Sequence, residues 1–241
     1  MSAIIDLVLL GILAICIWSG YKKGLLMGLG GILVIIIGIY GANLLANLFA
    51  YDLVPALRPF VSGYTESMMT DDDSEVLKEL GLTGTDYSMD DLFARSPERR
   101  APFAEACYSS LGIDGETAAR MAERTVLYAD EAGVGMRDAI VHILCETLGY
   151  VACFVLAFLL IVIVLTVIGN LPNLSFKIPQ LDLLNDIGGA VVGLVTGLMF
   201  CVLLVWALKF MGILIRGDTL PNAILGGWLL RWDPLQNYLG L

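Results

Sequence analysis

The chain has 241 residues, of which 58% are hydrophobic and 16% charged, and its mean hydropathy is +0.80. Soluble domains are usually less than half apolar and about a quarter charged. The apolar excess and the formal net charge of −10 exclude a collagen-like chain, a disordered chain, a disulfide scaffold and a basic nucleic-acid-binding protein. We therefore expect an integral membrane protein with no nucleic-acid partner.

Charge is distributed unevenly along the chain. Residues 51–148 hold 19 of the 24 acidic and 8 of the 14 basic residues, a balance of −11, whereas the other 143 residues have a balance of +1. The chain is thus an apolar framework with an acidic polar insert. The predicted parts are a transmembrane hairpin over 1–50, the insert over 51–146, a second transmembrane hairpin over 147–210 and an interfacial tail over 211–241.

Four apolar stretches are long enough to cross a bilayer, which takes about 20 helical residues. Because lipid offers the backbone no hydrogen bonds, each stretch is predicted to be a helix. The predicted fold is therefore an all-α integral membrane protein with four transmembrane helices arranged as two hairpins. The four stretches are Ile4–Tyr21, a span within Gly24–Tyr51, Thr147–Asn170 and Ile187–Leu208.

Basic residues in the short loops predict the orientation. Lys22 and Lys23 lie in the first turn and Lys177 lies in the third loop. Short loops rich in lysine and arginine face the cytoplasm, so the N-terminus, the insert and the C-terminus are expected outside. Arg216 and Arg231, which follow the last span, count against this orientation.

The insert begins at Pro55 and Pro59, which are expected to end the second span. It is predicted to be either a small helical subdomain or a mobile loop. A further helix is expected to begin at Met136 and to run on into the third span. The helix-like pieces within the insert are Ser74–Leu80, Ser88–Arg95, a piece opened by Ser96-Pro97, and Gly115–Glu131.

The tail, Met211–Leu241, is not expected to cross the membrane. Its apolar stretch Ala223–Leu230 is too short to span. Trp228 and Trp232, with Arg231 between them, are typical of a helix that lies in the membrane interface.

No catalytic motif is present: the chain has no Gly-x-Ser-x-Gly, Walker loop, dinucleotide fingerprint, HExxH or Cys-x-x-Cys sequence. The run Asp71–Asp73 lacks the ligand spacing of a calcium loop and is typical of a solvated helix start. His142, the only histidine, is expected at a wet helix end, with a proton-sensing pair with Glu146 as the alternative. The sequence predicts a non-enzymatic protein with no catalytic residue, cofactor or metal site.

Four polar residues are candidates for a functional role, and Asp6 leaves two interpretations open. As a residue near a helix start, Asp6 can cap its own helix, where a negative charge is favoured. Alternatively, Asp6 faces the bundle and bonds a partner span. The candidate polar residues are Asp6, Lys22, Lys23 and Asn185.

Glycines recur at helical spacing in two of the predicted spans. Glycines four residues apart make a smooth stripe, along which another helix can approach closely. The stripes predict packing between helices of one chain, and the alternative is contact between copies in a homo-oligomer. The predicted helix-packing residues are Gly20, Gly24, Gly28, Gly189, Gly193 and Gly197.

Two blocks of sequence carry a family resemblance. The first is Ile5-Asp6, an apolar run, and the turn Gly20-Tyr21-Lys22-Lys23-Gly24. The second is Leu184-Asn185-Asp186-Ile187-Gly188-Gly189, followed by Gly193 and Gly197. Together they resemble the hairpin and the Asn-x-x-x-Gly-x-x-x-Gly-x-x-x-Gly block of the colicin V production protein (CvpA) family. Asp186 and Thr196 depart from the family pattern, which often has basic residues at these two positions.

The resemblance implies a multi-pass protein of the bacterial inner membrane that takes part in colicin V production or export, or in cell-envelope homeostasis. With no catalytic group in the sequence, we expect it to act through the bilayer and through envelope or secretion proteins as partners. The alternative is a small oligomeric transporter or channel, for which Asp6, Asn43 and Asn47 within or beside the spans are the motivation.

Overall fold

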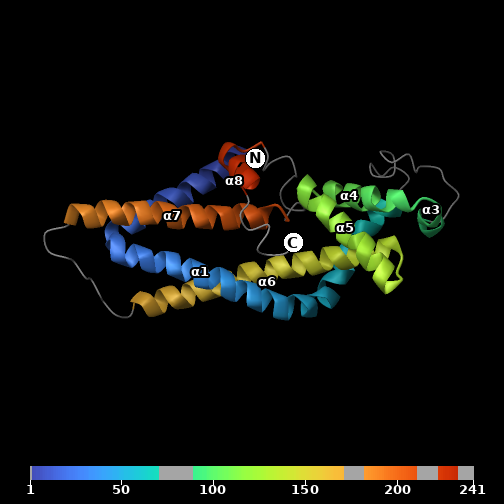
Figure 1. The fold of residues 1–241 in the computed structure, drawn as a ribbon, viewed down its shortest axis with the longest axis horizontal. Helices are drawn as coiled ribbons and strands as arrows, with labels where there is room; N and C mark the ends of the chain where they lie inside the picture. The colour runs from blue at the N-terminus through green and yellow to red at the C-terminus, as the bar shows by residue number, and fades with distance from the viewer. Residues whose placement is uncertain (1, 71–88, 171–181, 211–221, 233–241) are drawn as a thin grey trace. The chain divides into compact units, whose positions relative to one another are not determined.

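The computed structural model describes residues 2–70, 89–170, 182–210 and 222–232, and every regular element in these ranges is a helix (Figure 1). The predicted all-helical class is therefore confirmed for this part of the chain. The predictions for Asp71–Asp73, Ser74–Leu80 and Lys177 lie outside the described residues, as do the tail residues 211–221 and 233–241. The elements are α1 Ser2–Thr70, α3 Met89–Arg95, the short 3-10 helix η1 Pro97–Arg99, α4 Arg100–Ser110, α5 Gly115–Ala132, α6 Met136–Asn170, α7 Asp182–Leu208 and α8 Ile224–Trp232.

Three of these helices are long and apolar enough to cross a membrane, namely Ser2–Gly63 within α1, Met136–Gly169 within α6 and Asn185–Leu208 within α7. As predicted, a helix begins at Met136 and continues without a break through the third apolar stretch. The first of the three has 62 residues. At 1.5 Å per residue it would measure about 93 Å if straight, roughly three times the hydrocarbon thickness. This segment is therefore much longer than a single straight span.

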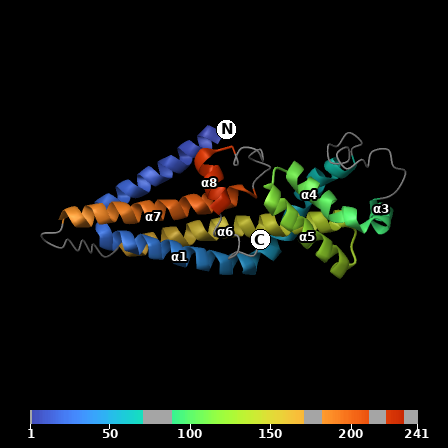
Figure 2. The same cartoon turned by 45° about the horizontal axis from the view of Figure 1, so that its top comes forward.

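The bend in α1 is at Gly24. Its φ of 78° and ψ of 174° are not helical, and they lie in a region that is open essentially to glycine alone. The residues before and after this turn form two limbs, which run back from the turn on either side of α7 (Figures 1 and 2). These two limbs of α1 correspond to the first two predicted spans. The arrangement of four spans as two hairpins remains a prediction.

The prediction that Pro55 and Pro59 end the second helix is wrong, because α1 continues through both to Thr70. A proline inside a helix costs about 3 kcal/mol or more, since it removes a hydrogen bond and crowds the preceding turn. This part of α1 gains packing that offsets the cost. Val54 and Val61, on either side of the prolines, are both buried in an apolar cluster with residues of α4, α5 and α6.

The described chain divides into two compact units. Unit 1 comprises the first 46 described residues of α1, the later part of α6, nearly all of α7, and α8. Unit 2 comprises the rest of α1, the helices α3 to α5 and the first part of α6. Within the described residues, unit 1 covers 2–47, 153–207 and 222–232, and unit 2 covers 48–70, 89–152 and 208–210.

Unit 1 is held together by close helix contacts. The second limb of α1 lies alongside α6 (Figures 1 and 2), where Gly38 faces Phe158 and Val162. Between α6 and α7, the ring centroids of Phe154 and Trp206 are 5.0 Å apart with their planes inclined by 62°, an arrangement that aromatic rings favour. Packing of this kind takes the place of the hydrophobic drive that lipid cannot supply.

Unit 2 has an apolar core of its own, to which the helices of the acidic segment contribute. Phe103 and Tyr108 of α4 and Met121 of α5 are buried there with residues of α6. The Tyr108 hydroxyl lies 2.6 Å from Thr125 Oγ1. Thr125 Oγ1 also donates to the Met121 carbonyl at 2.7 Å, and the Tyr108 hydroxyl also donates to the Ile140 carbonyl at 3.3 Å. Either hydroxyl can be the donor in the bond between them. The Tyr108 and Thr125 hydroxyls of this core are thus paired with each other.

Candidate functional site

The turn at Gly24 is closed by Asn185 from the start of α7. Asn185 Oδ1 accepts a hydrogen bond of 3.0 Å from the backbone N–H of Leu25, the first residue of the second limb. A helix N-terminus has backbone N–H groups with no partner in the helix, and a side-chain oxygen is their usual cap. Here the cap comes from a residue 160 positions away. A side chain at Gly24 would collide with the Asn185 amide group.

The glycine stripe of α7 packs against the first limb of α1. A Cβ added at Gly189 would collide with the Gly20 carbonyl oxygen and would lie 2.8 Å from the Gly24 Cα. A Cβ added at Gly193 would collide with the Cys16 carbonyl oxygen. At Gly197 the added atom would approach the Leu13 Cα to 3.3 Å. These glycines therefore allow backbone-to-backbone contact inside one chain.

Gly20 and Gly28 belong to the same contact from the other side. A Cβ at Gly20 would lie 2.8 Å from the Gly193 Cα, and a Cβ at Gly28 would lie 3.0 Å from Val192 Cγ1. The turn of α1 and the start of α7, which are the two blocks of the family resemblance, thus form one packed structure.

Asp6 caps α8 rather than its own helix. Its two carboxylate oxygens accept hydrogen bonds from three successive backbone N–H groups, those of Ile224 at 2.9 Å, Leu225 at 3.0 Å and Gly226 at 3.3 Å. These are the unpartnered donors of the first turn of α8. A carboxylate at this position also complements the positive end of the helix dipole. Asp6 and Asn185 therefore do the same thing: each fixes the start of a helix that is distant in sequence.

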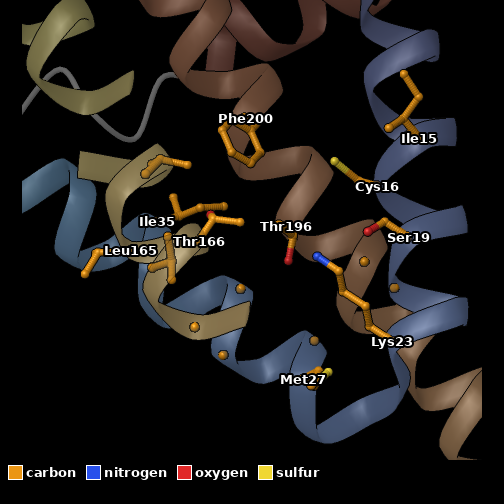
Figure 3. Close-up of a pocket in the computed structure, with 18 residues that line it drawn as sticks. Ile15, Cys16, Ser19, Lys23, Met27, Ile35, Leu165, Thr166, Thr196 and Phe200 are labelled. Atoms are coloured by element: carbon orange, nitrogen blue, oxygen red, sulfur yellow. The ribbon is translucent and has the colours of Figure 1, made fainter. Parts of the chain in front are cut away.

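Lys22 and Lys23 point to different places. The Lys22 ammonium lies over the ring of Trp18, 5.0 Å from its centroid, in a cation–π contact on the first limb. Lys23 instead lines a cavity of unit 1. Figure 3 shows the Lys23 side chain extending from the first limb toward Thr196 of α7, with Ser19 one turn away on the same limb.

The cavity beside the turn has a volume of about 500 Å³. Both limbs of α1, α6 and α7 contribute to its wall. Most of the wall is apolar, and the polar exceptions are the hydroxyls of Ser19, Thr166 and Thr196, the Cys16 thiol and the Lys23 ammonium (Figure 3). Gly20, Gly28 and Gly193 of the packed turn also line it, so the helix contact and the cavity are parts of one site.

Sequence reasoning did not find this cavity. The sequence pattern does not distinguish Ser19 and Thr166, because single hydroxyls are common in transmembrane helices and bond readily to their own backbone. The available signal was the co-occurrence of Ser19, Lys23, Thr166 and Thr196 at polar positions inside otherwise apolar spans.

His142 and Glu146, the alternative proton-sensing pair, each contact another residue of unit 2. Glu146 pairs with Arg124, whose Nη2 lies 3.6 Å from Glu146 Oε2. The His142 ring stacks on Tyr128, with the ring centroids 4.3 Å apart and the planes inclined by 8°. Among the residues that the structure describes, no group of three or more His, Cys, Asp or Glu side chains is placed to hold a metal ion.

Cys107, the cysteine of the acidic segment, is buried in the core of unit 2, and burial raises the pKa of its thiol to about 12 from 9.0. The thiolate is the reactive form, so this shift alone lowers the reactive fraction at neutral pH about 1,000-fold. We expect a maleimide to label Cys107 of the folded protein at least about 1,000-fold more slowly than a cysteine introduced at exposed Ser109, two residues along α4. Mass spectrometry of the purified Ser109→Cys protein measures both rates at once, and equal rates would show that the core of unit 2 is open.

Three described helices that are long and apolar enough to cross a membrane indicate a helical membrane protein. Residues 120–231 match the family described as Colicin V production protein. The match includes the block from Asn185 to Gly197 and confirms the resemblance for this part of the chain. No curated protein and no solved structure matches the chain.

Proposed function

We propose that this protein is a non-enzymatic component of the bacterial inner membrane that supports production or export of colicin V, or envelope homeostasis, through partner proteins. The family match over residues 120–231 is the observation that carries the proposal. The roles of the candidate polar residues agree with it. The oxygens of Asp6 and Asn185 accept hydrogen bonds from backbone N–H groups, which is a structural use of these side chains.

We propose that the acidic segment of unit 2 faces the outside of the inner membrane and meets the partners there. The proposal rests on Lys22 and Lys23 at the turn of α1, since short basic loops face the cytoplasm. The helices of this segment pack around a buried core, so they offer a folded surface to a partner.

Complementation tests the proposal. A colicin V-producing strain that lacks its own family member is supplied with this chain, and secreted toxin is measured by growth inhibition of sensitive cells. We expect the wild-type chain and Gly11→Ala to restore secretion, and Gly193→Leu to fail, because an added side chain at Gly193 collides with α1 while Gly11 has open space around it. Normal secretion without the chain, or with Gly193→Leu present at wild-type level, would contradict the proposal.

The alternative is a small oligomeric transporter or channel, for which the polar residues Asp6, Asn43 and Asn47 in or beside the spans are the reason. Each of these side chains has a hydrogen-bond partner within the chain. Asp6 accepts bonds from α8. Asn47 Nδ2 donates to both the carbonyl and the Oδ1 of Asn43 at 2.9 Å, so these amides are partly satisfied within their own helix. Solute flux in proteoliposomes that is lost with Lys23→Ala would restore this alternative.

A further inference from the structure

The cavity of unit 1 has the size and wall of a site for an apolar molecule. Its volume of about 500 Å³ lies in the range of roughly 300–1,000 Å³ that is typical of ligand pockets. Side chains from three helices supply the apolar wall. They include Met27, Val34, Ile35, Val162, Leu165 and Phe200.

Two glycines of the wall are not explained by helix packing. A Cβ added at Gly30 or at Gly169 would meet no atom within 4 Å, in contrast to the collisions at Gly189 and Gly193. Alanine favours a helix by about 1 kcal/mol over glycine, so a glycine at an open position gives up helix stability. Both Gly30 and Gly169 line the cavity. Both are also exposed, so a side chain added at either position has room beside the cavity.

One charged side chain, that of Lys23, lines this mostly apolar cavity. Lys23 is the one ionisable residue other than a cysteine among the described residues that line it, and no carboxylate lies on the wall to pair with its ammonium. Thr196 Oγ1, toward which Lys23 extends in Figure 3, already donates its proton to the Val192 carbonyl at 2.9 Å. A lysine has three donors and no acceptor, so the site has donors available for an anion.

We propose that this cavity binds an anionic glycerophospholipid, with the phosphate at Lys23 and an acyl chain against the apolar wall. The bilayer supplies such molecules at high concentration, and basic pockets between transmembrane helices are known to bind anionic headgroups. A single cation next to an apolar wall complements an amphiphile with one negative end. Binding of this kind is independent of toxin production, so each proposal can fail without the other.

Lys22 provides a matched control for the charge. It is the adjacent residue and has the same charge, but its ammonium lies over Trp18 instead of lining the cavity. Lys22→Ala and Lys23→Ala therefore change the net charge equally and differ in the site they affect. Gly30→Phe tests the apolar part, because Gly30 lines the cavity and a Cβ there has open space, so a bulky ring is placed at the wall without a collision at the Cβ.

The experiment measures lipid binding to the purified full-length protein in detergent by native mass spectrometry. The probes are phosphatidylglycerol and phosphatidylcholine with the same acyl chains, and inorganic phosphate alone. We expect the wild type to bind phosphatidylglycerol at least about tenfold more tightly than phosphatidylcholine, Lys23→Ala to lose this preference and Lys22→Ala to keep it. We expect Gly30→Phe to weaken binding of both lipids.

Several results would overturn the proposal. Equal binding of the two lipids by the wild type, or equal effects of Lys22→Ala and Lys23→Ala, would show that no specific headgroup site exists. Displacement of the lipid by inorganic phosphate would show an ion site without an acyl component. Unchanged lipid binding by Gly30→Phe would place the acyl chain elsewhere. If Gly30→Phe does not fold, Gly169→Leu replaces it, since Gly169 also lines the cavity with open space around it.

Discussion

Alanine at Gly189 or Gly193 is expected to destabilise the protein by about 1–3 kcal/mol or more, because the added methyl group collides with backbone atoms that cannot move aside independently. At Gly189 the obstacle is the Gly20 carbonyl oxygen, and at Gly193 it is that of Cys16. Relief requires α7 and the first limb of α1 to separate. That separation would also weaken the hydrogen bond from Leu25 to Asn185.

The measurement is the free energy of unfolding in mixed micelles, followed by tryptophan fluorescence. Gly11→Ala is the control. Gly11 lies on the first limb of α1, against which α7 packs, but a Cβ at Gly11 meets no atom within 4 Å. We expect this control to be neutral, or stabilising by up to about 1 kcal/mol, because alanine favours the helix. Unfolding energies for Gly193→Ala that match those of Gly11→Ala would contradict the packed contact between α1 and α7.

Replacing Asp6 with alanine should release α8. The substitution leaves the N–H groups of Ile224, Leu225 and Gly226 without their carboxylate acceptor. With nine residues, α8 is too short to be stable by itself, so it depends on this cap and on its packing. We expect hydrogen exchange of these three amides to rise about tenfold or more on loss of the cap.

Two further variants separate capping from general charge effects. Asp6→Asn retains an acceptor oxygen and should keep part of the protection. Asp52→Ala removes an exposed carboxylate from another part of α1 and should leave the three amides unchanged. Unaltered exchange in Asp6→Ala would mean that α8 is held without the Asp6 carboxylate.

Helix positions could be predicted from the sequence where local patterns decide them. The periodic segment Gly115–Glu131 and the apolar stretch Ile187–Leu208 lie within helices α5 and α7, each within a few residues of its bounds. The exception is the stretch at Pro55 and Pro59. There the burial of Val54 and Val61, which no local pattern displays, outweighs the proline penalty.

The site could be predicted only in part, because its contacts join distant residues. The glycine spacing identified which positions allow close approach but not what approaches them. Asp6 bonds residues about 218 positions away, and Asn185 bonds one 160 positions away. A carboxylate or an amide in an apolar span has many available partners, so its own sequence surroundings do not select one. The cavity likewise arises from the assembly of three helices.

The central proposal is that the acidic segment lies outside the inner membrane and that the basic turn of α1 lies in the cytoplasm. It is tested most directly by maleimide labelling in intact cells of two variants that each carry one added cysteine, Ser109→Cys and Lys22→Cys. Both positions are exposed, and the native cysteines other than buried Cys107 are replaced by alanine. We predict that a membrane-impermeant maleimide labels Ser109→Cys in intact cells and Lys22→Cys only after lysis. The reverse pattern would place the acidic segment in the cytoplasm and contradict the account.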